Sequence, residues 1–162
     1  MKGSKNLPEP LQFIKAIHDK GVKYLLIGRQ AVIAYGGPVQ SMDYDIYIDG
    51  SEENTNKLLE IAEDFSLSPS ISKKDMHKTF KFKLENEILI DVFRAKSLSS
   101  PQTGKILFED IYKRKVIAKD PNGLEINLPC LDDLITLKKM RSAPKDLLDI
   151  QYLQEIKKTQ NK

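Results

Sequence analysis

One stretch decides the fold, and it reads GRQAVIAYGGPVQSMDYDIYI from Gly28 to Ile48. The run Val22–Ile27 before it is short, aliphatic and β-branched, which predicts a buried central strand. Gln30–Tyr35 predicts a short helix, and Asp43–Asp49 predicts a second strand after a Gly-Gly-Pro turn. The chain is therefore expected to run strand, glycine, helix, strand, with two carboxylates on the second strand.

Asp43 and Asp45 form this carboxylate pair. Side chains alternate along a strand, so the two carboxylates share one face while Tyr44 points to the other. Like charges on an apolar strand repel each other, and a divalent cation that takes oxygen ligands, Mg²⁺ or Mn²⁺, would relieve the repulsion. The alternative is a pair exposed in a solvated turn, as in most Asp-x-Asp pairs. The position after a strand-glycine-helix unit favours a metal site.

Asp91 is the third candidate carboxylate, and it lies in the otherwise apolar strand Ile88–Phe93. A charge in such a strand needs a partner. If this strand lies beside the Asp43–Asp49 strand, three carboxylates converge and can hold two divalent ions, an arrangement that phosphoryl and nucleotidyl transfer use. The alternative is an ion pair with Arg94 or with another base at a strand end, and the strand alone does not decide between the two.

Gly28 is a candidate phosphate-binding residue. It follows a buried strand and precedes a helix, a junction at which backbone N–H groups suit a phosphate. The same glycine also serves in an ordinary turn, so its meaning comes from the carboxylate pair that follows a short loop later.

The other elements follow from periodicity and turn residues. Helices are predicted over Pro8–Lys20, Ser51–Phe65, Leu131–Arg141 and Lys145–Lys157, and hairpins over Phe80–Phe93 and Lys115–Leu128. Ser66–Asp75 predicts a loop with a short edge strand, Ser97–Gly104 a flexible loop, and residues 158–162 a frayed tail. The expected fold class is α+β, with one domain over residues 1–162, a mixed sheet flanked by helices, and two helices at the C-terminus.

Composition limits the function further. The chain has 162 residues, 30% of them charged, and a net charge of +3, which suits one soluble domain and allows, but does not require, contact with nucleic acid or nucleotides. The single cysteine, Cys130, excludes an internal disulfide and a multi-cysteine zinc site. His18 and His77 are the only histidines, which argues against a histidine-rich metal site. No stretch looks like a signal peptide or a membrane span, so a cytoplasmic protein is expected.

The segments YLLIG at 24–28 and SMDYDI at 41–46 resemble the polymerase-beta-type nucleotidyltransferase superfamily. Within it, the chain is most similar to the small nucleotidyltransferase-like proteins related to AbiEii toxins. DLITLK at 133–138 and KDLLDI at 145–150 resemble the two C-terminal helices of that group. The resemblance runs from about residue 24 to residue 153, and it implies a nucleotidyltransferase-like mixed sheet.

By this resemblance, Asp43 and Asp45 bind the metal, and Asp91 is a third carboxylate that helps to deprotonate the attacking hydroxyl. The implied nucleotide-binding residues are Gly28, Arg29, Ser41, Lys138 and Asp146. The implied reaction moves a nucleoside monophosphate from a nucleoside triphosphate to a hydroxyl of RNA, a protein or a small molecule, with Mg²⁺ or Mn²⁺ as cofactor. The implied biology is a toxin–antitoxin component, whose partner is an antitoxin or a second copy of the chain.

Three positions depart from the family pattern. Arg29 replaces the second Gly or Ser of the phosphate loop, and Val39 and Ala143 each replace an arginine. Arg29 could block a triphosphate or hold it bidentately. A second function therefore stays open: an inactive nucleotide-binding or antitoxin-like module. A nucleic-acid-binding domain is a weaker third reading, because basic residues are spread along the chain and Lys81 and Lys83 are typical of a solvated strand face.

Overall fold

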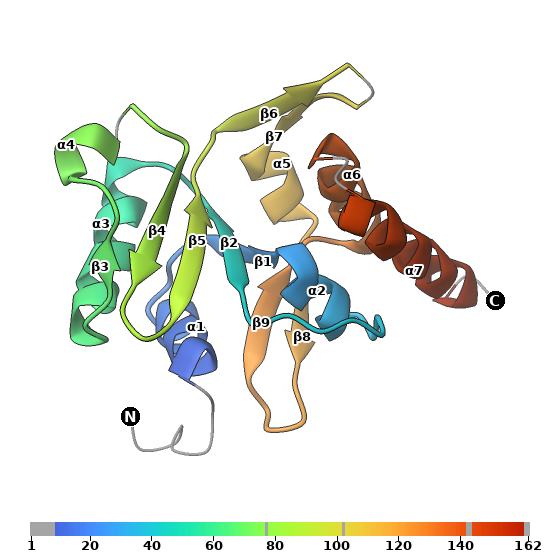
Figure 1. The fold of residues 1–162 in the computed structure, drawn as a ribbon, viewed down its shortest axis with the longest axis horizontal. Helices are drawn as coiled ribbons and strands as arrows, with labels where there is room; N and C mark the ends of the chain where they lie inside the picture. The colour runs from blue at the N-terminus through green and yellow to red at the C-terminus, as the bar shows by residue number, and fades with distance from the viewer. Residues whose placement is uncertain (1–8, 77, 102, 142–143, 161–162) are drawn as a thin grey trace.

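A mixed five-stranded sheet organises the chain (Figure 1). The computed structural model describes residues 9–160 except 77, 102 and 142–143. In spatial order the strands are β1 (Tyr24–Ile27), β2 (Tyr44–Ile48), β5 (Leu89–Phe93), β4 (Lys81–Glu85) and β3 (Ser68–Pro69). β2 and β5 run parallel, whereas the other neighbouring strands run antiparallel. The predicted α+β fold class is confirmed.

Helices pack on both faces of this sheet. They are α1 (Glu9–Asp19), α2 (Gly28–Ala34), α3 (Glu52–Asp64), α4 (Lys73–Met76), α5 (Phe108–Lys113), α6 (Leu131–Arg141) and α7 (Pro144–Gln160). α1 and α3 cover one face, where Phe13 and Leu58 join Ile46 in the main hydrophobic core. α5 packs on the other face, where the ring of Phe108 lies edge-on to that of Tyr47. Among the described residues, no helix is both long and apolar enough to cross a bilayer.

Alternation along the two central strands decides which side chains reach the site. Ile46 in β2 and Ile90 in β5 are fully buried in the main core. Their neighbours Asp45 and Asp91 therefore project from the opposite face of the sheet, as does Phe93. Burial of the isoleucines fixes the register of each strand, because a slip of one residue would bring a carboxylate into the core.

Two hairpins extend from the sheet. β8 (Val116–Lys119) and β9 (Glu125–Leu128) pair antiparallel around the predicted turn, in which Asp120 Oδ1 accepts hydrogen bonds from two backbone N–H groups. The flexible loop predicted over residues 97–104 was wrong, because β6 (Ser97–Ser100) and β7 (Gly104–Leu107) form a hairpin there. Leu98 and Ile106 of that hairpin pack against the cluster around Tyr47, so tertiary packing orders a segment whose composition is typical of a loop.

Several other predicted helices and strands are present, some with different first or last residues. Ser51 caps α3 as predicted and accepts a hydrogen bond from the backbone N–H of Asn54. α6 has its predicted bounds, but α2 begins at Gly28 and β2 begins at Tyr44. α7 continues to Gln160, past the predicted start of the frayed tail, and residues 161–162 lie outside the described part of the chain.

Candidate active site

Three carboxylates lie along one cleft on the face of the sheet opposite the main core. Asp45 and Asp91 are register partners on the parallel strands β2 and β5, and Asp43 lies one residue before β2. All three line a cavity of about 210 Å³. Asp91 Oδ1 is buried and has no hydrogen-bond partner among the described residues. Arg94, the alternative partner, instead donates to the backbone carbonyls of Met76 and Gly50.

Gly28 makes room for one of these carboxylates. Its φ is +69°, a left-handed conformation that favours glycine. A Cβ at this position would overlap Asp45 Oδ2. Gly28, which was predicted to bind phosphate, therefore has a packing role that sequence reasoning missed: it lets the Asp45 carboxylate pack against the β1–α2 junction.

Cationic side chains face the carboxylates across the same cleft. Arg29, Lys81 and Lys145 all line it, together with Ser41. Lys81 is exposed on its strand face, as predicted, and its Nζ lies over the ring of Phe93, 5.2 Å from the centroid. The position of Lys81 beside the cleft follows from the strand register, which pairs residue 81 with residue 93. The cleft thus combines three carboxylates with three cations.

The loop before β2 is held by polar contacts. Ser41 Oγ accepts a hydrogen bond from the backbone N–H of Asp43 at 3.2 Å. Gln30 Nε2 in α2 donates to the carbonyl of Ser41 at 2.7 Å. These contacts place Ser41 beside the carboxylates, although its hydroxyl already serves the backbone of its own loop.

A buried ion network joins the C-terminal helices to this cleft. Lys138 Nζ in α6 donates to Asp149 Oδ2 at 2.8 Å and to Asp146 Oδ1 at 3.3 Å in α7. Asp149 also binds Arg29, whose Nη2 lies 3.2 Å from Asp149 Oδ1. Lys138 is 4% exposed and both aspartates are fully buried. Buried charges are seldom found unless they are paired. Here the two carboxylates are paired with Lys138 and Arg29.

This network changes the meaning of two predicted nucleotide-binding residues. Asp146 has no exposed surface, and its carboxylate binds the ammonium of Lys138. Lys138 does line a cavity, but its ammonium is engaged by carboxylates. Asp149 was missed as a site residue, although its spacing of three from Asp146 placed both acids on one helix face beside apolar neighbours.

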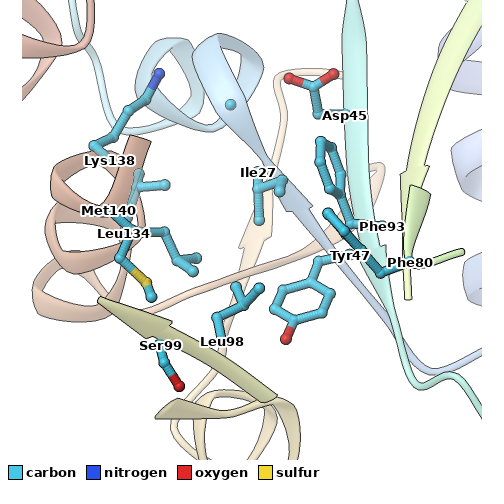
Figure 2. A pocket seen from close by; sticks show the side chains of 12 residues that line it. Ile27, Asp45, Tyr47, Phe80, Phe93, Leu98, Ser99, Leu134, Lys138 and Met140 are labelled. Atoms are coloured by element: carbon cyan, nitrogen blue, oxygen red, sulfur yellow. The ribbon is translucent and has the colours of Figure 1, made fainter. Parts of the chain in front are cut away.

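A second cavity of about 310 Å³ adjoins Asp45 (Figure 2). Its lining is predominantly apolar and comes from the sheet, from β6 and from α6. The lining residues are Ile27, Gly28, Asp45, Tyr47, Phe80, Phe93, Leu98, Ser99, Leu134, Leu137, Lys138 and Met140. Asp45 and Phe93 belong to both cavities. The sequence did not predict this pocket, because its walls come from segments far apart in the chain.

The donor chemistry around Asp45 suits a hard divalent ion. The three acids offer only oxygen atoms, the ligands that Mg²⁺ and Mn²⁺ prefer. Among the described residues, however, no three His, Cys, Asp or Glu side chains are grouped so that they could hold a metal ion together. The three carboxylates line one cleft and would have to turn toward one another to share an ion.

Comparison with known proteins identifies the fold. No protein-family model matches the chain, and no curated protein matches it by sequence. Among solved structures, it is similar to the lincosamide antibiotic adenylyltransferase LnuA in its lincomycin-bound form, with a TM-score of 0.65 and 17% identity over 91% of this chain and 96% of that chain. A Thermotoga maritima protein assigned as a nucleotidyltransferase matches with a TM-score of 0.60 and 18% identity, over 96% of this chain and 94% of that one.

The antibiotic-resistance factor ANT(2'')-Ia matches as well. Its TM-score is 0.63 at 15% identity, over 90% of this chain and 81% of that chain. At identities of 15–18%, these likenesses show the fold. The chain therefore has the fold of nucleotidyltransferases.

Proposed function

We propose that this protein transfers a nucleoside monophosphate from a nucleoside triphosphate to an acceptor hydroxyl. One observation carries the proposal: Asp45 and Asp91 lie side by side on parallel strands, and Asp43 lines the same cleft. The nucleotidyltransferase fold of the chain supports the same reaction. The closer likeness to AbiEii-type toxins stays a prediction.

The triphosphate is proposed to bind along the cationic wall of the 210 Å³ cleft. Arg29 and Lys145 come from the start of α2 and of α7, and Ser41 adds a hydroxyl beside Asp43. Cations hold phosphate oxygens through charge-assisted hydrogen bonds, and Arg29 can bind two oxygens at once. The polyphosphate would then lie between these cations, with its α-phosphorus toward the carboxylates.

The oxygen ligands on the carboxylate side of the cleft suit a divalent ion, which the three acids would share after turning toward one another. Asp43, Asp45 and Asp91 would hold Mg²⁺ or Mn²⁺, and the orphaned Asp91 Oδ1 offers a buried ligand atom. When bound, such an ion neutralises phosphate charge and so lowers the barrier to attack on phosphorus. Gly28 supports the arrangement because it leaves space for the Asp45 carboxylate.

The protein's own side chains supply the remaining steps. The acceptor oxygen forms a bond to the α-phosphorus, and its proton passes to a carboxylate oxygen of Asp91. The bond between the α-phosphorus and the bridging oxygen breaks, and pyrophosphate leaves with the electron pair. Arg29 and Lys145 stabilise the charge that develops on the pyrophosphate. Most of the rate enhancement comes from positioning and charge neutralisation.

A non-catalytic nucleotide-binding module is the second candidate. It is favoured by the ion pair that already holds Arg29 against Asp149 and by Val39, which packs against the core where the family pattern has an arginine. Ala143, the third departure, lies outside the described residues. In this alternative the cleft binds a nucleotide but does not turn it over.

The test is transfer of label from each nucleoside triphosphate labelled on the α-phosphate. The wild-type protein, Asp45→Asn and Asp64→Asn are incubated with Mg²⁺ or Mn²⁺ and with small alcohols, RNA or cell extract as acceptors. Asp64 is exposed at the end of α3, so Asp64→Asn controls for the loss of an acidic side chain. We expect label transfer by the wild type and Asp64→Asn, but not by Asp45→Asn. Nucleotide binding without transfer would favour the non-catalytic module.

A further inference from the structure

The apolar cavity beside Asp45 has charged groups at one end only. Figure 2 shows the Asp45 carboxylate and the Lys138 ammonium at one end of the pocket, and Leu98 and Ser99 at the other. Lys138 is neutralised by two buried carboxylates, so it adds little net charge to the cavity. Apart from these two, the polar atoms of the lining side chains are the hydroxyls of Ser99 and Tyr47.

The walls of this cavity are neutral and well anchored. The Tyr47 hydroxyl donates to the carbonyl of Ala95 at 2.7 Å, and burial raises the pKa of Tyr47 to about 12. Its ring therefore offers an uncharged surface whose polar end is already satisfied. Leu134 and Met140 of α6 face this ring across the pocket (Figure 2). A volume of about 310 Å³ is enough for a small organic molecule.

We propose that this pocket binds the acceptor, and that the acceptor is a small uncharged alcohol with an aromatic or branched aliphatic body. The inference rests on the proposed nucleotidyl transfer and names its substrate class. Burial of apolar surface against apolar walls is favourable in free energy, and this burial would give the acceptor its affinity. The hydroxyl would lie at the charged end, where transfer takes place.

Phe93 links the pocket to the carboxylates. It lines both cavities and follows Asp91 by two residues on the same face of β5. A molecule that packs against this ring from the apolar side can direct a hydroxyl toward Asp45 and Asp91. The polar cleft is left for the triphosphate, so the two substrates approach the carboxylates from different cavities.

Other occupants fit the lining less well. RNA would bring phosphates, but the lysine in this pocket is already paired. A polycationic aminoglycoside would find a single carboxylate, Asp45, among the lining residues. A nucleobase carries hydrogen-bonding groups along its edge, and burial without partners costs each of them free energy. The neutral polar groups of the lining are the hydroxyl of Ser99 and that of Tyr47, which already donates to Ala95, so the base is better placed in the polar cleft.

The experiment measures binding and transfer separately. Neutral alcohols from cyclohexylmethanol to 2-naphthylethanol, a polycationic aminoglycoside and a short RNA are titrated against the wild-type chain, with binding followed by ligand-observed NMR. Nucleotide affinity is measured in parallel by calorimetry with a non-hydrolysable triphosphate. Leu98→Asn places a polar group of similar size in the pocket, and Leu147→Asn makes the same change at an exposed position on α7.

We expect the neutral alcohols to bind the wild type and Leu147→Asn alike, and Leu98→Asn to weaken their binding by about fivefold or more. Nucleotide affinity should stay unchanged in both variants. Met140→Gln gives the same test from α6 if Leu98→Asn does not fold. Equal alcohol binding in the pocket variants and the wild type would overturn the proposal, and so would a fivefold loss of nucleotide affinity, which would assign the pocket to the base.

Transfer then separates this inference from the proposed function. If the chain labels other acceptors but not the alcohols that occupy the pocket, the acceptor assignment is wrong and the nucleotidyl transfer stands. If nothing is labelled although alcohols and nucleotide both bind, the proposed function fails, and the acceptor role fails with it. Label on the bound alcohols, lost in Leu98→Asn and kept in Leu147→Asn, supports both.

Discussion

Replacing Gly28 with alanine tests how the carboxylate site is built. A Cβ at this position would overlap Asp45 Oδ2 and lie 3.1 Å from Asp45 Cγ and 3.2 Å from Asp45 Cβ. The left-handed φ of +69° costs a residue with a Cβ about 1–2 kcal/mol, and displacement of the packed carboxylate adds about 1–3 kcal/mol. We expect Gly28→Ala to lower the free energy of unfolding by about 2–5 kcal/mol.

Gly21→Ala is the matched control for backbone strain. Gly21 has a similar φ of +78°, and a Cβ there would meet no atom within 4 Å. The loss of unfolding free energy in Gly21→Ala therefore reports the cost of the left-handed conformation without a steric clash. It includes the effect of alanine on the unfolded chain. Urea unfolding followed by circular dichroism gives both values. Equal losses in the two variants would refute the reasoning, because they would show that Asp45 does not pack against residue 28.

Four further predictions concern metal binding, triphosphate binding, the buried ion network and the effect of the protein on growth. Asp45→Asn should weaken Mg²⁺ or Mn²⁺ binding in a calorimetric titration, and an unchanged affinity would contradict the metal assignment. Arg29→Ala should weaken triphosphate binding by about 1.5–3 kcal/mol, and equal affinity would show that Arg29 serves only its ion pair with Asp149. Lys138→Met should lower the free energy of unfolding by about 3–5 kcal/mol in urea titrations, because Asp146 and Asp149 both lose the buried ammonium that binds them. If the chain is a toxin, its expression should slow bacterial growth in liquid culture while Asp43→Ala should not, and harmless expression of active protein would argue against toxicity.

The arrangement of the site shows how the same residues serve both stability and chemistry. Arg29 lines the polar cleft and at the same time contacts the buried Asp149. Through Lys138, the network extends from the start of α2 to both C-terminal helices. A substitution in this network is therefore expected to change the fold's stability and the position of Arg29 together, so activity and unfolding must be measured on each variant.

Much of the fold was predictable because its signals are local. The strand, glycine and helix at the N-terminal end, the Asp120 turn and the bounds of α6 follow from periodicity and turn chemistry within a few residues. The local signals predicted a flexible loop over residues 97–104, because its serines and glycine are typical of a loop. The strands there are instead stabilised by contacts with residues distant in sequence.

The sequence by itself determined that Asp45 and Asp91 would each stand out from an apolar strand, because alternation and charge are properties of the strand alone. Only the tertiary structure decided that these strands lie side by side and parallel, with the two acids in register. It also decided that Asp149 reaches Arg29 across 120 residues, that Lys81 and Lys145 join the cleft, and that an apolar pocket adjoins Asp45. The physical reason is that sheet pairing and helix docking are set by burial of the whole core, and no local pattern encodes which distant segments will meet.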